Sequence, residues 1–131
     1  MTTTYSIVPL SASTDFRGIK IAATSSPGTT IHTAQASTVL PDLLHLEFCN
    51  TDTVARPLTL EWGGTTNPDD RKAYLLLPGE NRVVGHQAPI RNALVIKASS
   101  ITMTWIDGVS YAGAANVVVC TGGSYVQRQL T

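Results

Sequence analysis

The residues best suited to metal chemistry are three widely separated histidines, His32, His45 and His86. None belongs to a close pair such as H-x-H or H-E-x-x-H, the spacings by which one segment supplies two zinc ligands. Strand alternation places His45 on an outer face beside Glu47, opposite Thr59 or Glu61 of the next strand, where one histidine and two carboxylates could bind zinc. Chance pairing of polar residues on a solvated face is far more common, so we predict no metal site and no cofactor.

A second candidate for metal binding is the acidic pair Asp69 and Asp70, with Asn67 nearby. The spacing lacks the D-x-[DN]-x-[DN]-G pattern that arranges oxygen ligands around calcium. Asn and Asp side chains cap the local backbone and Pro68 fixes φ, so this segment is typical of a turn.

Catalytic patterns are absent from the sequence. There is no G-x-S-x-G motif, and no Ser or Cys stands beside a His with an orienting acid. The glycine pairs Gly63-Gly64 and Gly122-Gly123 lack the strand-to-helix context and the lysine of a phosphate-binding loop. We therefore predict that the protein is not an enzyme and has no catalytic residues.

The two cysteines, Cys49 and Cys120, both lie in apolar runs. They could form one disulfide, but no secretory signal pattern places the chain in an oxidising compartment. Buried free thiols are the favoured interpretation because an unpaired Cys behaves as a small hydrophobic residue.

The aromatic residues divide into two groups. Trp62 and Trp105 fall on the apolar faces of their strands, which predicts a place in the core or at the centre of a subunit interface. A carbohydrate-binding module would instead need outward aromatic platforms, for which the candidates are Tyr74, Tyr111 and Tyr125.

The elements that would position these residues are strands. Apolar and polar residues alternate with period two in many short segments, and no segment has the spacing of an amphipathic helix, although residues 40–44 could form one turn. About 8–10 short strands at spacings of 8–12 residues predict an all-β fold, either an antiparallel β-sandwich or a jelly-roll-like barrel. The expected core anchors are Leu46, Phe48, Leu60, Trp62, Ile96, Met103 and Trp105.

Turn residues suggest how these strands connect. We expect hairpins around residues 25–28, around 50–56 and around the Gly122-Gly123 pair. Residues 63–70 form a turn-rich loop, and Pro78-Gly79 supplies a tight turn because Gly accepts a positive φ.

Both ends of the chain differ from the middle. We expect an extended N-terminal arm over residues 1–16, a sandwich domain over 17–108 and a C-terminal tail over 109–131. Such ends either add a strand to a neighbouring subunit or pair at the edges of their own sheet. The candidate interface residues are Thr2, Thr3, Thr4, Tyr5, Tyr125, Val126 and Leu130.

Composition excludes several partners. The 131 residues contain nine Lys+Arg and nine Asp+Glu, so the formal net charge is zero and no basic stripe is available for nucleic acid or a membrane surface. No apolar run approaches the roughly 20 residues that span a bilayer. Charged residues are only 14% of the chain, and a neutral surface with little charge repulsion suits a protein that works in an assembly.

Two segments carry a family resemblance. PGTTIHTA at residues 27–34 and LTLEWGGTTNPDD at 58–70 resemble small virion structural proteins of tailed bacteriophages, over about residues 18–107. The resemblance implies a capsid decoration or cement protein, a homotrimer that binds the outer head surface, bridges major capsid proteins and occupies the host cytoplasm before assembly. Two alternatives stay open: a tail, neck or baseplate component, and a virion-surface module that binds glycans.

Overall fold

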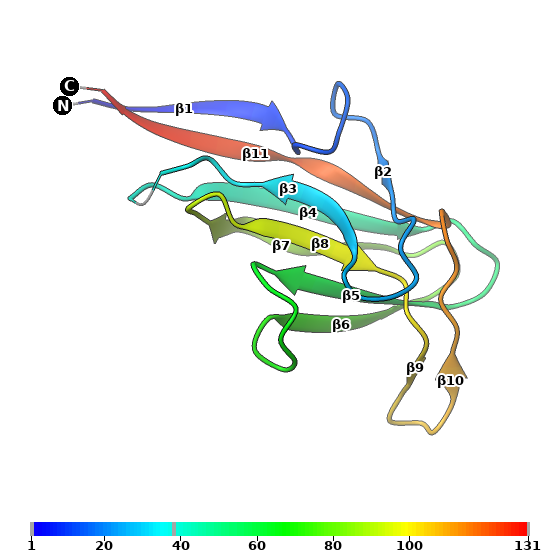
Figure 1. The fold of residues 1–131 in the computed structure, drawn as a ribbon. Coiled ribbons are helices and arrows are strands. Elements are labelled where there is room, and N and C mark those ends of the chain that lie inside the picture. The colour runs from blue at the N-terminus through cyan, green and yellow to red at the C-terminus, as the bar shows by residue number, and fades with distance from the viewer. Residues whose placement is uncertain (1, 38, 131) are drawn as a thin grey trace.

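The computed structural model describes residues 2–37 and 39–130, and side chains over residues 6–37 and 39–126. The described chain is all-β, and its two main sheets are antiparallel and pack face to face without closing into a barrel (Figure 1). The predicted fold class is therefore confirmed, in its sandwich form.

A five-stranded sheet forms one layer, with the strand order β1, β11, β4, β7. The short β2 pairs with the part of β11 that β1 does not reach. The strands are β1 (Thr2–Pro9), β2 (Ile19–Lys20), β4 (Asp42–Asn50), β7 (Asn81–Ile90) and β11 (Val118–Leu130).

A four-stranded sheet forms the other layer, in the order β3, β8, β5, β6. Its strands are β3 (Thr29–Thr33), β5 (Arg56–Trp62), β6 (Arg71–Leu76) and β8 (Val95–Ser99). A two-stranded ribbon of β9 (Met103–Thr104) and β10 (Ser110–Tyr111) extends from the body at the end away from the chain termini (Figure 1).

The core lies between the two sheets and follows the predicted alternation. Of the expected anchors, four are completely buried: Leu46, Phe48, Leu60 and Ile96. Trp62 is half-buried and packs against the margin of this core.

Met103 and Trp105 are also half-buried, but they lie outside the core cluster, contrary to the prediction. The hydroxyl of Thr59 donates to the Met103 sulfur at 3.6 Å, which puts Met103 on the outer face of the four-stranded sheet. The cause is that β8 ends at Ser99, so the chain leaves the sheet before Met103.

The outer face of β5 is a second difference. Thr59 and Glu61 were expected in solvent, yet they are only 3% and 1% exposed. The Glu61 carboxylate accepts hydrogen bonds from the backbone N–H of Gly28 at 2.7 Å and the hydroxyl of Ser26 at 2.9 Å. A loop thus covers this face, and Glu61 satisfies the backbone of that loop.

Most predicted hairpins are crossovers between the sheets. Residues 51–55 join β4 to β5, and residues 21–28 join β2 to β3, in each case from one layer to the other. The segment at 63–70, predicted as a turn-rich loop, joins β5 to β6 in a hairpin, and Gly79 has φ 72° in its predicted turn. Residues 40–44 form no helical turn, because β4 begins at Asp42.

Both chain ends belong to the sandwich. β1 pairs with β11 over eight residues, and β11 lies between β1 and β4. Leu10, Val118 and Cys120 are core residues. The described parts of the predicted arm and tail, residues 2–16 and 109–130, are therefore strands and connections of one domain. The hairpin predicted at the Gly122-Gly123 pair is wrong, because the pair lies within the continuous β11. Glycine is required at residue 122 since a Cβ there would collide with the carbonyl oxygen of His45.

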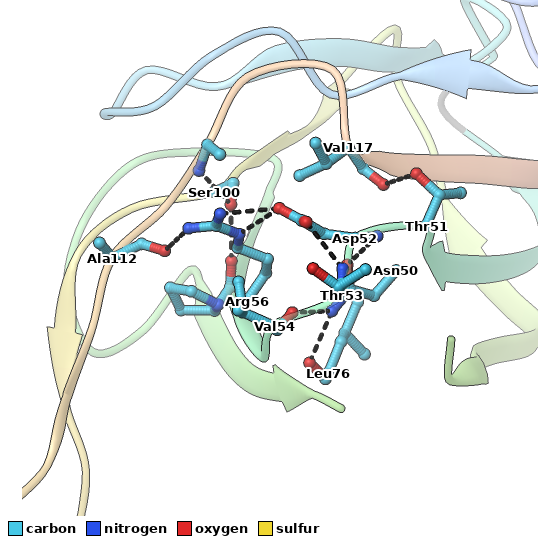
Figure 2. A network of polar contacts seen from close by, with 12 residues as sticks. Asn50, Thr51, Asp52, Thr53, Val54, Arg56, Leu76, Ser100, Ala112 and Val117 are labelled. Carbon is cyan, nitrogen blue, oxygen red and sulfur yellow. Dashed lines mark hydrogen bonds and ion pairs between the residues drawn. The ribbon is translucent and has the colours of Figure 1, made fainter. Parts of the chain in front are cut away.

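A polar network closes the end of the sandwich where β4 leaves its sheet (Figure 2). The buried Asn50 amide donates to the carbonyl oxygen of Leu76 at 3.0 Å. Arg56 donates to the Asp52 carboxylate at 2.7 Å and to the carbonyl oxygen of Ala112 at 2.8 Å. The connection that precedes β11 is thereby fixed to the crossover between the sheets.

Candidate assembly surface

β1 is an edge strand whose outer side faces no other strand in the described part of the chain. Its sequence TTTYSIVP contains no charged residue, and its one proline is at the last position. The register with β11 is unbroken over eight residues, so β1 has no bulge either. Charges, prolines, bulges and covering segments are the usual protection of an edge, and an edge without them is a template for another strand.

The predicted interface residues gather at this edge. The backbones of residues 2–5 pair with residues 127–130, whose described pairing is with β1 alone, and this two-stranded end extends beyond β4 where the termini meet (Figure 1). Tyr125 and Val126 are half-buried in β11. The remaining predicted residues have side chains outside the described part: Thr2, Thr3, Thr4, Tyr5 and Leu130.

An apolar row crosses the outer face of the five-stranded sheet beside this edge. Ile7, Tyr125, Leu43 and Pro89 are directly opposite one another on β1, β11, β4 and β7. Directly opposite residues point to the same face, and Leu44 beside Leu43 points into the core, so the row points outward. Ile7 is 64% exposed. The open edge and the apolar row are adjacent and form the candidate assembly surface.

The opposite edge of the same sheet is protected. β7 carries Arg82 and Pro89, and its pairing with β4 is interrupted by two register shifts. Trp62 of the other sheet donates its indole N–H to the carbonyl oxygen of Pro89 at 3.3 Å. Each of these features hinders the addition of a strand to β7.

The residues considered as zinc ligands around His45 do not come together. His45 and Glu47 are in β4, whereas Thr59 and Glu61 belong to the other sheet. No group of three or more His, Cys, Asp or Glu side chains could hold a metal within the described residues. His45 instead lies beside His86, a neighbour that the sequence did not reveal.

The acidic turn agrees with its structural interpretation, whereas the thiols agree with theirs only in part. The Asp70 carboxylate accepts the backbone N–H of Thr66 at 3.1 Å and so closes its own loop. Both cysteines are free. Cys120 points into the core, where burial raises the pKa of its thiol to about 12. Cys49 is on the opposite face of the sheet and is half-buried, so only one of the two thiols is buried as predicted.

The three tyrosines considered for glycan binding expose little of their rings, because Tyr74, Tyr111 and Tyr125 are all half-buried. The Tyr111 hydroxyl donates to Asp107 at 3.2 Å, and this bond raises the pKa of Tyr111 above 10.0. The guanidinium of Arg82 lies 5.8 Å from the Tyr74 ring centre. A groove of 330 Å³ beside Trp62 is a further candidate for glycans, but the Lys72 ammonium lies over the indole at 5.6 Å.

A buried pair between the sheets was not anticipated. His32 of β3 donates from Nε2 to the Asp42 carboxylate of β4 at 2.8 Å, because its Nδ1 already accepts the backbone N–H of Ser11 at 3.0 Å. Both side chains are buried. Both ring nitrogens of His32 are hydrogen-bonded. The pair therefore links β3 to β4 and is not available for catalysis.

Comparisons with known proteins add no relative. No family model matches the chain, and neither the curated proteins nor the solved structures contain a significant match. The described residues include no helix that is long and apolar enough to cross a membrane.

Proposed function

We propose that this chain is a structural, non-enzymatic protein of a tailed-phage virion, a capsid decoration or cement protein that binds the outer head surface and bridges major capsid proteins. The sequence support is the resemblance carried by residues 27–34 and 58–70. The structural observation that carries the proposal is the unprotected edge of β1 beside the outward apolar row.

The two parts of this surface have separate tasks in the proposal. The apolar row packs between copies in a homotrimer, because apolar area is what stabilises a permanent interface. The β1 edge adds to a strand of the major capsid protein, where main-chain hydrogen bonds give affinity without charge complementarity. A neutral, Thr-rich strand suits this role since it brings no charge to bury.

Paired lysine substitutions test the proposal. Ile7→Lys places a charge at the open edge and in the apolar row, and we expect it to abolish both trimer formation and binding to heads that lack the protein. Val83→Lys is the matched control because Val83 is 54% exposed on β7 and lies outside the row. Both side chains are largely in solvent, so each change should alter stability by no more than about 0.5 kcal/mol.

Light scattering gives the oligomeric state, and co-sedimentation with heads gives the binding. Equal behaviour of the two variants would refute the assignment of β1 as the assembly edge. Copy number then tests the first alternative, since hundreds of copies per virion indicate decoration and a few to a few tens indicate a tail, neck or baseplate part.

A further inference from the structure

Two histidines that are 41 residues apart in the sequence meet on the outer face of the five-stranded sheet. His45 of β4 and His86 of β7 place their Nδ1 atoms 3.4 Å apart. The ring centres are 5.6 Å apart and the ring planes are nearly perpendicular, at 89°. His45 is half-buried and His86 is exposed, so a solute can reach the pair.

The fold builds this pair at an irregular point of the sheet. The register between β4 and β7 shifts between Leu44 and Leu46, so His86 and the residue after it bulge opposite His45. Gln87, within this bulge, has φ 52°. On the other side, the backbone of His45 is held by the close approach of Gly122. Bulges redirect side chains and are frequent next to functional sites.

The separation of the two nitrogens matches that of two ligands of one ion. With metal–nitrogen bonds of about 2.0–2.1 Å and tetrahedral angles, the ligand nitrogens lie about 3.4 Å apart. We infer that His45 and His86 form a two-histidine site for a borderline divalent transition metal such as Zn²⁺, Ni²⁺ or Cu²⁺. Imidazole is a preferred ligand of these ions. Rotation of the exposed His86 ring directs both lone pairs at the ion.

The surroundings define what kind of site this is. Gly123 is the residue opposite His45 on β11, so no side chain rises beside the pair on that strand. No third protein ligand is provided by the described residues, and water completes the coordination. Structural zinc sites use four protein ligands, so this site exchanges its metal and is not required for folding. It does not depend on the proposed function.

Titration calorimetry of the EDTA-treated, untagged protein with ZnCl₂ tests the inference. We expect one ion per chain, and His86→Asn should weaken binding by about tenfold or more because one of two ligands is lost. Asn81→Ala is the matched control, since it changes another exposed residue of β7 and should leave the affinity unchanged.

A ¹⁵N spectrum of the unchanged protein gives an independent readout. Zn²⁺ should shift the Nδ1 resonances of both His45 and His86, whereas those of His32 should stay in place because both of its nitrogens are bonded. Unshifted resonances at millimolar ZnCl₂, or equal affinity of the unchanged protein and His86→Asn, would show that the two rings share only a hydrogen bond.

Discussion

The two edges of the five-stranded sheet have opposite designs. β7 carries a charge at Arg82, a proline at Pro89 and two register shifts, and the indole of Trp62 binds one of its carbonyl oxygens. β1 has an unbroken register, and its one proline is at the last position. Both edges belong to the same sheet, so the difference comes from the sequence of each strand and not from the architecture.

This difference teaches how a β-sandwich limits its own association. A sheet with two open edges can add strands at both sides and grow into a fibre. A sheet with one open edge accepts a single strand and then stops. Protection of β7 together with exposure of β1 is therefore what a protein needs in order to dock once, at a defined place.

Removal of the open edge should have the largest effect. Deletion of residues 1–9 takes away β1, and we expect complete loss of head binding together with a lower free energy of unfolding, because β11 loses eight paired residues. Co-sedimentation and urea denaturation measure the two effects. Head binding that survives the deletion in a folded protein would place the contact elsewhere.

Removal of the features that protect the β7 edge should have the next largest effect, an increase in self-association. Arg82→Thr combined with Pro89→Val removes the charge and the proline from β7, and we expect concentration-dependent association into species larger than the proposed homotrimer, which the unchanged protein should not form. The salt bridge from Arg82 to Glu80, at 2.7 Å, is partly exposed, so its loss should cost less than about 1 kcal/mol.

Analytical ultracentrifugation would detect the new association. Arg91→Thr, just after β7, is the control for loss of positive charge. If the double variant sediments like the control, charge and proline are not what protects this edge, and the register shifts are sufficient.

The sequence predicted which side chains are buried better than it predicted which strands are neighbours. Alternation identified Leu46, Phe48 and Leu60 because period two reports directly which face of a strand meets the core. It could not report pairing. The turn residues at 50–56 predict a hairpin between adjacent strands, whereas β4 and β5 lie in different sheets. Alternation predicts Glu61 in solvent, since the loop contacts that bury it come from residues 33 and 35 positions away and leave no local pattern.

The candidate assembly surface could be predicted only in part, because it too depends on strand pairing that the sequence pattern does not report. The sequence predicts an extended arm over residues 1–16 that either adds to a neighbouring subunit or pairs in its own sheet, but it does not identify β11, which is more than a hundred residues away in the chain, as the partner of β1. By its sequence pattern, His45 is a candidate zinc ligand. Its neighbour His86, however, is brought near by a register shift that no local pattern encodes. Long-range register is set by the whole sheet.

A decrease in pH should lower the free energy of unfolding without changing head binding through β1. This is the smallest of the expected effects. The hydrogen bond from Arg56 holds the pKa of Asp52 below its ordinary value of 3.8. A carboxyl group with a lowered pKa stabilises the fold at pH values above its pKa in the unfolded chain, and this contribution is lost as the pH falls through its pKa in the folded protein.

The free energy of unfolding should therefore decrease below about pH 4, and less steeply in Asp52→Asn than in the control Asp69→Asn. β1 contains no carboxylate and no histidine, so its contribution to head binding should stay constant over the same pH range in which the free energy of unfolding decreases. Urea denaturation at several pH values and co-sedimentation at the same values measure both quantities, and a parallel decrease would mean that a titrating group, and not the bare edge, governs docking.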